Sequence, residues 1–525
     1  MNILDKIKNS WNHKESVEQN IIRFSNEQEQ RQRRIKKLYP LFIGLFVIAC
    51  LVFPINPLVG ICLMIGTISF GSESVFKSAT TGDTHIAVLD STHFVVVYSS
   101  SGYKSVIGTI SGSSISYGSE YTAPGLNYGT IDVLDSTHFV ITYRGDTGKG
   151  TCVIGTVSSG NQISYGTAAE FDTSNTLSTY TRAAIVKKIS STSFIVLYMV
   201  GNAGKVVIGT VSSGNTINYG SVSNTNRYTL YADIAVLDST HFVIVFADWL
   251  SGYFASAIIG TMSGNSITGY GPLSEFYRQS YNLCRVEKID STHFIVVFNN
   301  NSTYKLQCAI ATRASTSISY GDIYEPFNSS ASDTNLILLD STHFVLQAEN
   351  QVKLGIISNT DEITFETAVG FNGGGSINYS GMYKISDTDF VLSYVDVNNS
   401  NYGTVIIGTN PPPVVAPTVT TQSATNIATT SCTGNGNITA TGGENCTRRG
   451  FCYKVGTSGD PTTSDSVAYD DGSFGTGAFT KSITGLTPNT SYRVRTYAVN
   501  SAGTSYGTTV NVKTLSAFIP RTMWF

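Results

Sequence analysis

The stretch "HIAVLDSTHFVVVYSSSGYKSVIGTISGSSISYGSE", residues 85–120, decides the fold because much of it recurs along the chain. Its central "DSTHF" (90–94) returns unchanged at four later places, 135–139, 238–242, 290–294 and 340–344. Two weaker copies, "SSTSF" and "SDTDF", stand at 190–194 and 386–390. Recurrence at near-regular intervals indicates a repeat architecture before it indicates chemistry.

Seven repeats follow when the copies are aligned on their phenylalanine, at Phe94, Phe139, Phe194, Phe242, Phe294, Phe344 and Phe390. Each repeat holds four strand-like runs, in the first copy "IAVL", "HFVVVY", "SVIGTI" and "SISYGS", separated by turn residues. The second run is apolar without alternation, which predicts a strand covered on both faces. Seven units of four strands predict an all-β fold with a seven-bladed β-propeller over 67–410.

The two ends of the repeat region complement each other. The last repeat ends at "VIIGTN" (405–410) and lacks its fourth run, whereas "ISFG" (68–71) stands alone before the first repeat. We therefore expect the N-terminal strand, 67–72, to complete the seventh blade and remove a pair of exposed sheet edges.

The N-terminal region predicts a membrane anchor. The run over 38–66 carries no charged residue and is long enough as a helix to cross a bilayer, with a kink expected at Pro54 and Pro57. The basic "RQRRIKK" precedes it, so 1–37 is expected to be a helical, cytoplasmic tail at the plasma membrane. Everything after the span then lies in the extracellular space or the periplasm. The basic run reads as the flank of an anchor, and no nucleic-acid partner is expected.

A second module is predicted after the proline-rich linker "PPPVVAP" (411–417). Over 418–515, short strands alternate with turn signals. The stretch "GLTPNTSYRVRTYAVNSAG" (485–503), with "RRGFCY" and "DDGSFGTGAFTKSITGL", resembles the fibronectin type III domain of bacterial surface proteins. The resemblance implies a β-sandwich in which the hydroxyl of Tyr492 caps backbone, used as a spacer or contact module without catalytic residues. The repeats likewise resemble those of uncharacterised bacterial surface proteins, and the tail 516–525 has no assigned role.

The repeated "LDSTHF" is interpreted as a turn between the first and second strands, because Asp and Ser side chains bond nearby backbone. A metal ring built from the five histidines is the alternative, but equivalent positions on neighbouring blades lie too far apart to share one ion. No metal and no cofactor are therefore expected. Cys432, Cys446 and Cys452 permit at most one disulfide within the second module.

Binding is expected where the repeats differ. The loops after the second and fourth strands vary most, and in a propeller both sets emerge on one face. Their aromatic side chains and guanidinium groups suit sugars, peptides or carboxylates. The predicted ligand-binding residues are Arg182, Arg227, Tyr228, Tyr231, Trp249, Tyr253, Tyr277, Arg278 and Tyr281.

The leading functional hypothesis is a membrane-anchored extracellular binding or adhesion protein that recognises a glycan or a protein. No phosphate-binding loop, G-x-S-x-G or H-E-x-x-H motif is present, so an enzyme is not the first expectation. A surface glycan hydrolase or lyase stays open, with Asp146, Asp248, Glu275 and Asp396 as candidate acids, and a convergent Asp/Glu/Arg cluster in the central cleft would favour it. A structural cell-surface protein that self-associates is the third hypothesis.

Overall fold

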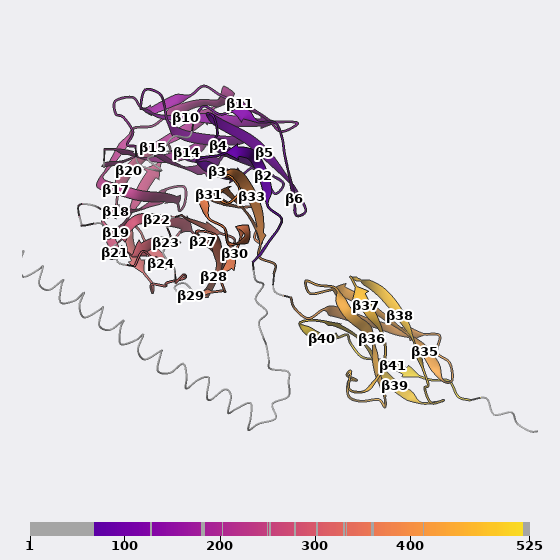
Figure 1. Ribbon diagram of the computed structural model, residues 1–525. Helices are drawn as coiled ribbons and strands as arrows, with labels where there is room; N and C mark the ends of the chain where they lie inside the picture. Colours follow the sequence, from indigo (N-terminus) through magenta and orange to yellow (C-terminus); the bar gives the residue numbers. More distant parts are fainter. Residues whose placement is uncertain are drawn as a thin grey trace, which may run out of the picture. The chain divides into compact units, whose positions relative to one another are not determined.

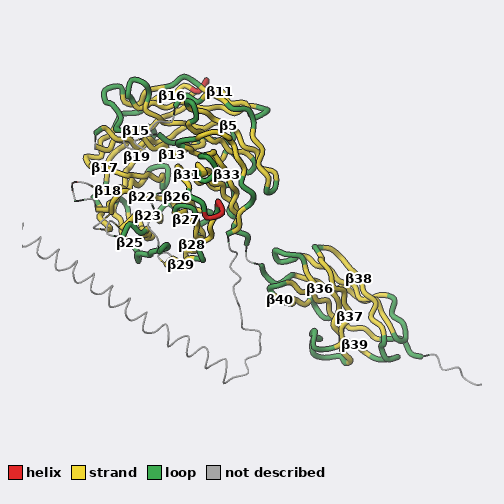
Figure 2. The backbone as a smooth tube through the Cα atoms, in the orientation of Figure 1, coloured by secondary structure: helices red, strands yellow, loops and turns green. Residues whose placement is uncertain are grey.

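The computed structural model describes residues 68–517, apart from 126–128, 180–183, 202, 249, 251, 253, 278–279, 301–302, 329–330, 332, 359–361, 413 and the side chains of 280–282. The described backbone is almost entirely strand and loop, and its two short helical turns are η2 (Ser213–Asn215) and η4 (Asn372–Gly374) (Figure 2). The prediction of an all-β fold is confirmed. The predicted tail 1–37 and anchor 38–66 lie outside these residues, among which no helix is long and apolar enough to cross a membrane.

Seven four-stranded antiparallel units make up residues 68–410, here called the ring. The first, inner strands of the units are β3 (Thr84–Val88), β8 (Ile131–Val133), β13 (Ala184–Ser190), β17 (Ser223–Val236), β22 (Ser280–Lys288), β26 (Thr334–Leu338) and β31 (Ile377–Lys384). The second strands are β4 (His93–Ser99), β9 (His138–Arg144), β14 (Ser193–Val200), β18 (His241–Asp248), β23 (His293–Asn300), β27 (His343–Ala348) and β32 (Asp389–Asp396).

The third strands are β5 (Tyr103–Ser111), β10 (Gly150–Ser158), β15 (Ala203–Ser212), β19 (Phe254–Ser263), β24 (Leu306–Ala314), β28 (Gln351–Ser358) and β33 (Tyr402–Thr409). The fourth strands are β6 (Ser114–Tyr117), β11 (Gln162–Tyr165), β16 (Thr216–Tyr219), β20 (Ser266–Tyr270), β25 (Ser317–Tyr320), β29 (Glu362–Phe365) and, in the seventh unit, β1 (Ser69–Phe70). Short additional strands pair with the third strands of five units: β2 (Ser74–Thr80), β7 (Tyr121–Thr122), β12 (Ala169–Asp172), β21 (Ser274–Tyr277) and β30 (Val369–Gly370).

The units are arranged around a common centre (Figure 1). Each inner strand contacts the inner strand of the next unit, and β31 of the seventh unit contacts β3 of the first. Most sheets stay separate, so side-chain packing rather than one continuous hydrogen-bonded barrel joins the units. The N-terminal β1 pairs with β33, with Ser69 opposite Thr409 and Phe70 opposite Gly408. Residues from the two ends of the ring thus share one sheet.

A phenylalanine packed on a glycine explains why both residues recur. Phe139 at the start of β9 is opposite Gly155 on β10, and a Cβ on Gly155 would overlap the Phe139 ring. The same pair occurs in the first, third, fourth, sixth and seventh units. The fourth-strand Tyr165 meets the Phe139 ring edge-on, with 6.0 Å between the centroids. Its hydroxyl donates to Oγ of Ser105 in the neighbouring unit at 2.8 Å, so Tyr165 joins two adjacent sheets.

The C-terminal module consists of two antiparallel sheets. One contains β34 (Thr418–Thr425), β35 (Ser431–Ala440) and β38 (Gly477–Thr484), and the other contains β36 (Cys446–Val455), β37 (Ser466–Phe474), β39 (Ser491–Asn500), β40 (Gly503–Tyr506) and β41 (Val510–Lys513). The buried Tyr492 hydroxyl accepts the backbone N–H of Thr487 at 2.8 Å. The three cysteines of this module are buried free thiols, and the described part of the chain contains no disulfide.

Candidate functional site

Alternation of strand direction gives the ring two faces. Connections between first and second strands, and between third and fourth strands, lie at one end of every unit, called here the turn face. Connections between second and third strands, and from the fourth strand to the next unit, lie at the other end, called the loop face. The repeated "DSTHF" segments therefore lie on the turn face.

The turn face is built from one hydrogen-bond network used five times. In the first unit the Oδ1 atom of Asp90 accepts the N–H and the hydroxyl of Thr92, both at 2.7 Å. Nδ1 of His93 lies 3.1 Å from the same carboxylate. Corresponding contacts recur at Asp135, Asp238, Asp290 and Asp340. Each histidine thus serves its own turn, and no group of metal-binding side chains occurs anywhere in the described chain.

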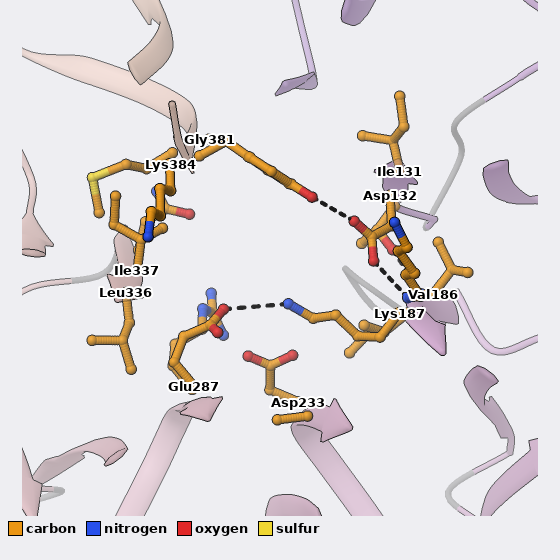
Figure 3. Close-up of a pocket in the computed structure, with 18 of the residues that line it drawn as sticks. Ile131, Asp132, Val186, Lys187, Asp233, Glu287, Leu336, Ile337, Gly381 and Lys384 are labelled. Carbon is orange, nitrogen blue, oxygen red and sulfur yellow. Dashed lines mark hydrogen bonds and ion pairs between the residues drawn. The ribbon is translucent and has the colours of Figure 1, made fainter. Parts of the chain in front are cut away.

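A polar cavity of about 450 Å³ lies among the inner strands (Figure 3). Equivalent positions form two successive levels, because each inner strand pairs with its second strand in the same register. Nearer the turn face are Ala87, Asp132, Lys187, Ala235, Glu287, Ile337 and Tyr383. Nearer the loop face are His85, Thr130, Ile185, Asp233, Arg285, Asn335 and Gly381. The cavity therefore receives side chains from all seven units.

Several cavity side chains bond the backbone of the next inner strand. Asp132 accepts the N–H of Lys188 at 2.6 Å through Oδ2, and Asp233 accepts the N–H of Val286 at 3.3 Å. Arg285 donates a hydrogen bond rather than accepting one: its Nε donates to the backbone carbonyl of Thr334 at 3.1 Å. An inner strand is a sheet edge with unpaired backbone groups, and these contacts satisfy some of them. The first role of Asp132 and Asp233 is therefore to join units.

Two further contacts bridge next-but-one units across the cavity. Tyr383 of the seventh unit donates its hydroxyl to Oδ1 of Asp132 in the second unit at 2.8 Å. Lys187 of the third unit pairs with Glu287 of the fifth at 3.4 Å. The intervening units place Ala87 and Ala235 at this level, and these short side chains leave room for the longer ones to pass.

Glu287 and Lys187 both have shifted pKa values. The side chains of Glu287 and Lys187 are 29% and 33% exposed, and both are directed into the cavity together with Asp132 and Asp233 (Figure 3). Burial raises the pKa of Glu287 above its usual range, with Asp233 adding to the shift and Lys187 opposing it. Burial would lower the pKa of Lys187, but the attraction of Glu287, Asp233 and Asp132 raises it overall. Lys187 therefore stays protonated, while Glu287 holds its proton to a higher pH than an ordinary glutamate does.

The structure places four of the predicted binding residues. Arg227, Tyr228 and Tyr231 follow one another on β17, and Nη1 of Arg227 lies 3.7 Å from Oδ2 of the buried Asp248. Tyr277 accepts a hydrogen bond from Asn300 at 2.6 Å. Tyr231 and Tyr277 belong to the fourth unit, whereas Tyr228 pairs with Ala203 on β15 of the third unit. The others lie outside the described side chains: Arg182, Trp249, Tyr253, Arg278 and Tyr281.

The candidate catalytic acids are spread over three units. Asp248 and Asp396 are buried and hold loop backbone, since they accept the N–H groups of Leu250 and Asn398, each at 3.1 Å. Asp146 and Glu275 are exposed, in the second and fourth units respectively. The acids that do share a cavity lie instead at 132, 233 and 287.

A signal for the cavity residues was present in the repeats. The first copy reads "IAVL" before its turn, whereas later copies read "IDVL", "VKKI", "VEKI" and "MYKI". Charged residues in a run that is apolar elsewhere mark positions where the inner strands face a polar space. Comparing the repeats column by column would have identified Asp132, Lys187 and Glu287.

No family model and no curated protein sequence matches the chain. Among solved structures, a protein from Lactobacillus plantarum is similar with a TM-score of 0.43 and 11% identity, over 55% of this chain and 85% of that one. A protein of unknown function from Dyadobacter fermentans is similar with a TM-score of 0.38 and 7% identity, over 65% of this chain and 99% of that one. Likeness at this level carries no functional argument, so the site rests on its own geometry.

Proposed function

We propose that the chain is a membrane-anchored extracellular binding protein that recognises a glycan or a protein through the loop face of its ring. In this proposal the ring is a seven-bladed β-propeller closed by its N-terminal strand, and the C-terminal module is a fibronectin type III domain used for reach or a second contact. Residues 38–66 hold it in the membrane lipid, with 1–37 in the cytoplasm. The sequence alone supports the anchor and its orientation.

The observation that carries the binding role is where exposed apolar side chains gather. Eight large apolar side chains are exposed among the described residues of the ring. All eight belong to loop-face connections or to inner strands near that face: Val75, Val222, Tyr231, Leu250, Tyr304, Ile323, Tyr379 and Val397. Leu250 is 62% exposed. Exposed apolar groups concentrated on one face, beside a polar cavity, are typical of a binding surface.

A matched pair of substitutions on the fourth unit tests the role of the loop face. Leu250 precedes β19 on the loop face, whereas Ser263 ends the same strand on the turn face. The full-length chain in detergent is applied to an array of glycans and bacterial surface proteins, beside Leu250→Glu and Ser263→Glu. We expect saturable binding that Leu250→Glu weakens about tenfold or more and Ser263→Glu leaves unchanged. Equal loss in both variants, or concentration-dependent oligomers without any ligand, would contradict the proposal.

A second function is favoured by one observation, the elevated pKa of Glu287 inside a cavity that also holds Asp132, Asp233 and Arg285. A carboxyl group whose pKa is raised by burial is suited to protonate a glycosidic oxygen, as in a glycan hydrolase. Asp132 and Asp233 are already bonded to backbone, which is why binding is preferred as the main function. If the chain released reducing ends from a polysaccharide and Glu287→Gln abolished that release, hydrolysis rather than binding would be the preferred function.

A further inference from the structure

Two tyrosines occupy the same unusual backbone position near the loop-face mouth of the cavity. In β17 the pairing with β18 shifts register between Leu230 and Asp233, and in β31 the pairing with β32 shifts between Asn378 and Gly381. Each shift is a β-bulge that contains one extra residue. Tyr231 lies in the first bulge and Tyr379 lies at the equivalent position of the second.

Both tyrosines have a left-handed backbone, with φ of 52° at Tyr231 and 51° at Tyr379. This conformation suits glycine and is costly for a bulky side chain. Burial does not offset the cost, because the two residues are 38% and 52% exposed. Strained residues at bulges often mark places where a side chain is redirected for function. A left-handed tyrosine occurs at the equivalent bulge position in two units of the same ring, which argues against a chance placement.

The surroundings of the two bulges favour an uncharged ligand. Asp233 and Gly381, two residues further along each strand, line the cavity itself. The charged groups at this level already bind backbone, since Asp233 accepts the N–H of Val286, Asp333 accepts the N–H of Ser380 at 2.8 Å, and Arg285 donates to the carbonyl of Thr334. Exposed phenol rings two residues from positions that line a space with hydrogen-bonding groups match the apolar faces and hydroxyl edges of pyranose sugars.

We propose that Tyr231 and Tyr379 are stacking platforms for the pyranose rings of a neutral glycan chain at the mouth of the cavity. The inference rests on the proposed binding function and specifies its ligand class and two of its contacts. The fourth and seventh units lie three positions apart around the ring, so the platforms flank the mouth from separated sides. A chain of several sugars rather than a single sugar fits this arrangement.

The test uses the full-length chain in detergent and a panel of neutral hexasaccharides: α-1,4-glucan, β-1,4-glucan, β-1,4-xylan and β-1,4-linked N-acetylglucosamine. Tyr231→Gly and Tyr379→Gly are compared with Ser315→Gly by isothermal titration calorimetry. Ser315 is the control because it is also left-handed, with φ of 57°, and exposed, but it lies on the turn face between β24 and β25. Each mouth variant should weaken the Kd for at least one oligosaccharide about tenfold or more, and the control by less than about twofold.

Thermal unfolding separates a ligand contact from a packing role. Glycine relieves the left-handed strain, so the Tm of both mouth variants should equal or exceed that of the unmodified chain. Glycan binding that both variants retain would overturn the inference and leave the proposed function intact. Binding only to proteins on the loop face would also overturn it, as would a fall in Tm that accompanies the loss of binding. Absence of any ligand for the unmodified chain would overturn the inference and the proposed function together.

Discussion

The turn face and the loop face of the ring are made by the same seven units, yet they follow different rules. On the turn face, five units repeat one Asp–Thr–His network. On the loop face, side chains differ from unit to unit, and Leu250 and Tyr304 are exposed to solvent. The comparison teaches that repetition marks where geometry must be kept, while variation marks where a ligand can be selected.

The largest expected effect breaks this comparison at the repeated phenylalanine. Phe139 is fully buried against Gly155 and Tyr165, so Phe139→Ala should lower the free energy of unfolding by about 3–5 kcal/mol. Leu250→Ala on the loop face should change it by less than about 0.5 kcal/mol. Urea denaturation of both variants checks the difference, and equal destabilisation would remove the distinction between the faces.

A smaller effect is expected from the glycine beneath the ring. A Cβ on Gly155 overlaps Phe139, so Gly155→Ala should destabilise the chain by about 1–3 kcal/mol through overpacking. The fifth unit provides the control, because Ala311 already stands opposite Phe294 there. Ala311→Gly should cost about 0.5–1 kcal/mol, as an added glycine in a strand does. Denaturant midpoints of the two variants measure the difference. A Gly155→Ala variant as stable as the unmodified chain would contradict the packing argument.

The cavity between the faces gives the next effect. Tyr383→Phe removes the hydroxyl that donates to Asp132, and Asp132 keeps its bonds to the N–H groups of Val133 and Lys188. We expect a loss of about 1–1.5 kcal/mol in the free energy of unfolding, without loss of ligand binding at the loop face. The Tm and the array signal of the variant test this together. Abolished binding with an unchanged Tm would place Tyr383 in the ligand site.

The smallest effect is a pH dependence confined to the turn face. Burial alone would raise the pKa of Asp238, but hydrogen bonds from Thr240 and His241 hold it at about 2. Because this value lies below that of an unfolded aspartate, the contribution to stability is complete above about pH 4 and is lost as the pH falls towards 2. Asp238→Asn should therefore reduce the fall in Tm between about pH 5 and 2.5, an effect of about 1 kcal/mol at most.

The loop-face variant Asp146→Asn is the control for this acid titration, since Asp146 is exposed outside the turn network. Its Tm should follow the unmodified chain across the same pH range. A Tm profile of Asp238→Asn that coincides with both would contradict the stabilising role of the turn carboxylate.

The turn face could be read from the sequence because its interactions are local. The contacts of Asp90 join residues two and three positions away, so one short segment contains all the information. The second strands could be predicted equally well, since a run such as "FVVVY" is apolar on both faces. The pairing of β1 with β33 followed from a missing fourth run, a counting argument that needs no side-chain detail.

The cavity could not be read in the same way. Tyr383 and Asp132 are 251 positions apart in the sequence, and their contact depends on the short Ala87 between them in space. Asp248 was one of four candidate acids on the variable loops, but in the structure it bonds the N–H of Leu250. The bulges at Tyr231 and Tyr379 were also hidden, because a register shift depends on pairing with the neighbouring strand.

Hydrogen–deuterium exchange of the full-length chain, with and without a ligand captured on the array, tests the central claim most directly. The account predicts slower exchange on the loop face, around 226–234, 298–306 and 377–382, with the repeated turns at 90–94 and 290–294 unchanged. Protection confined to those turns, with the loop face unchanged, would contradict it.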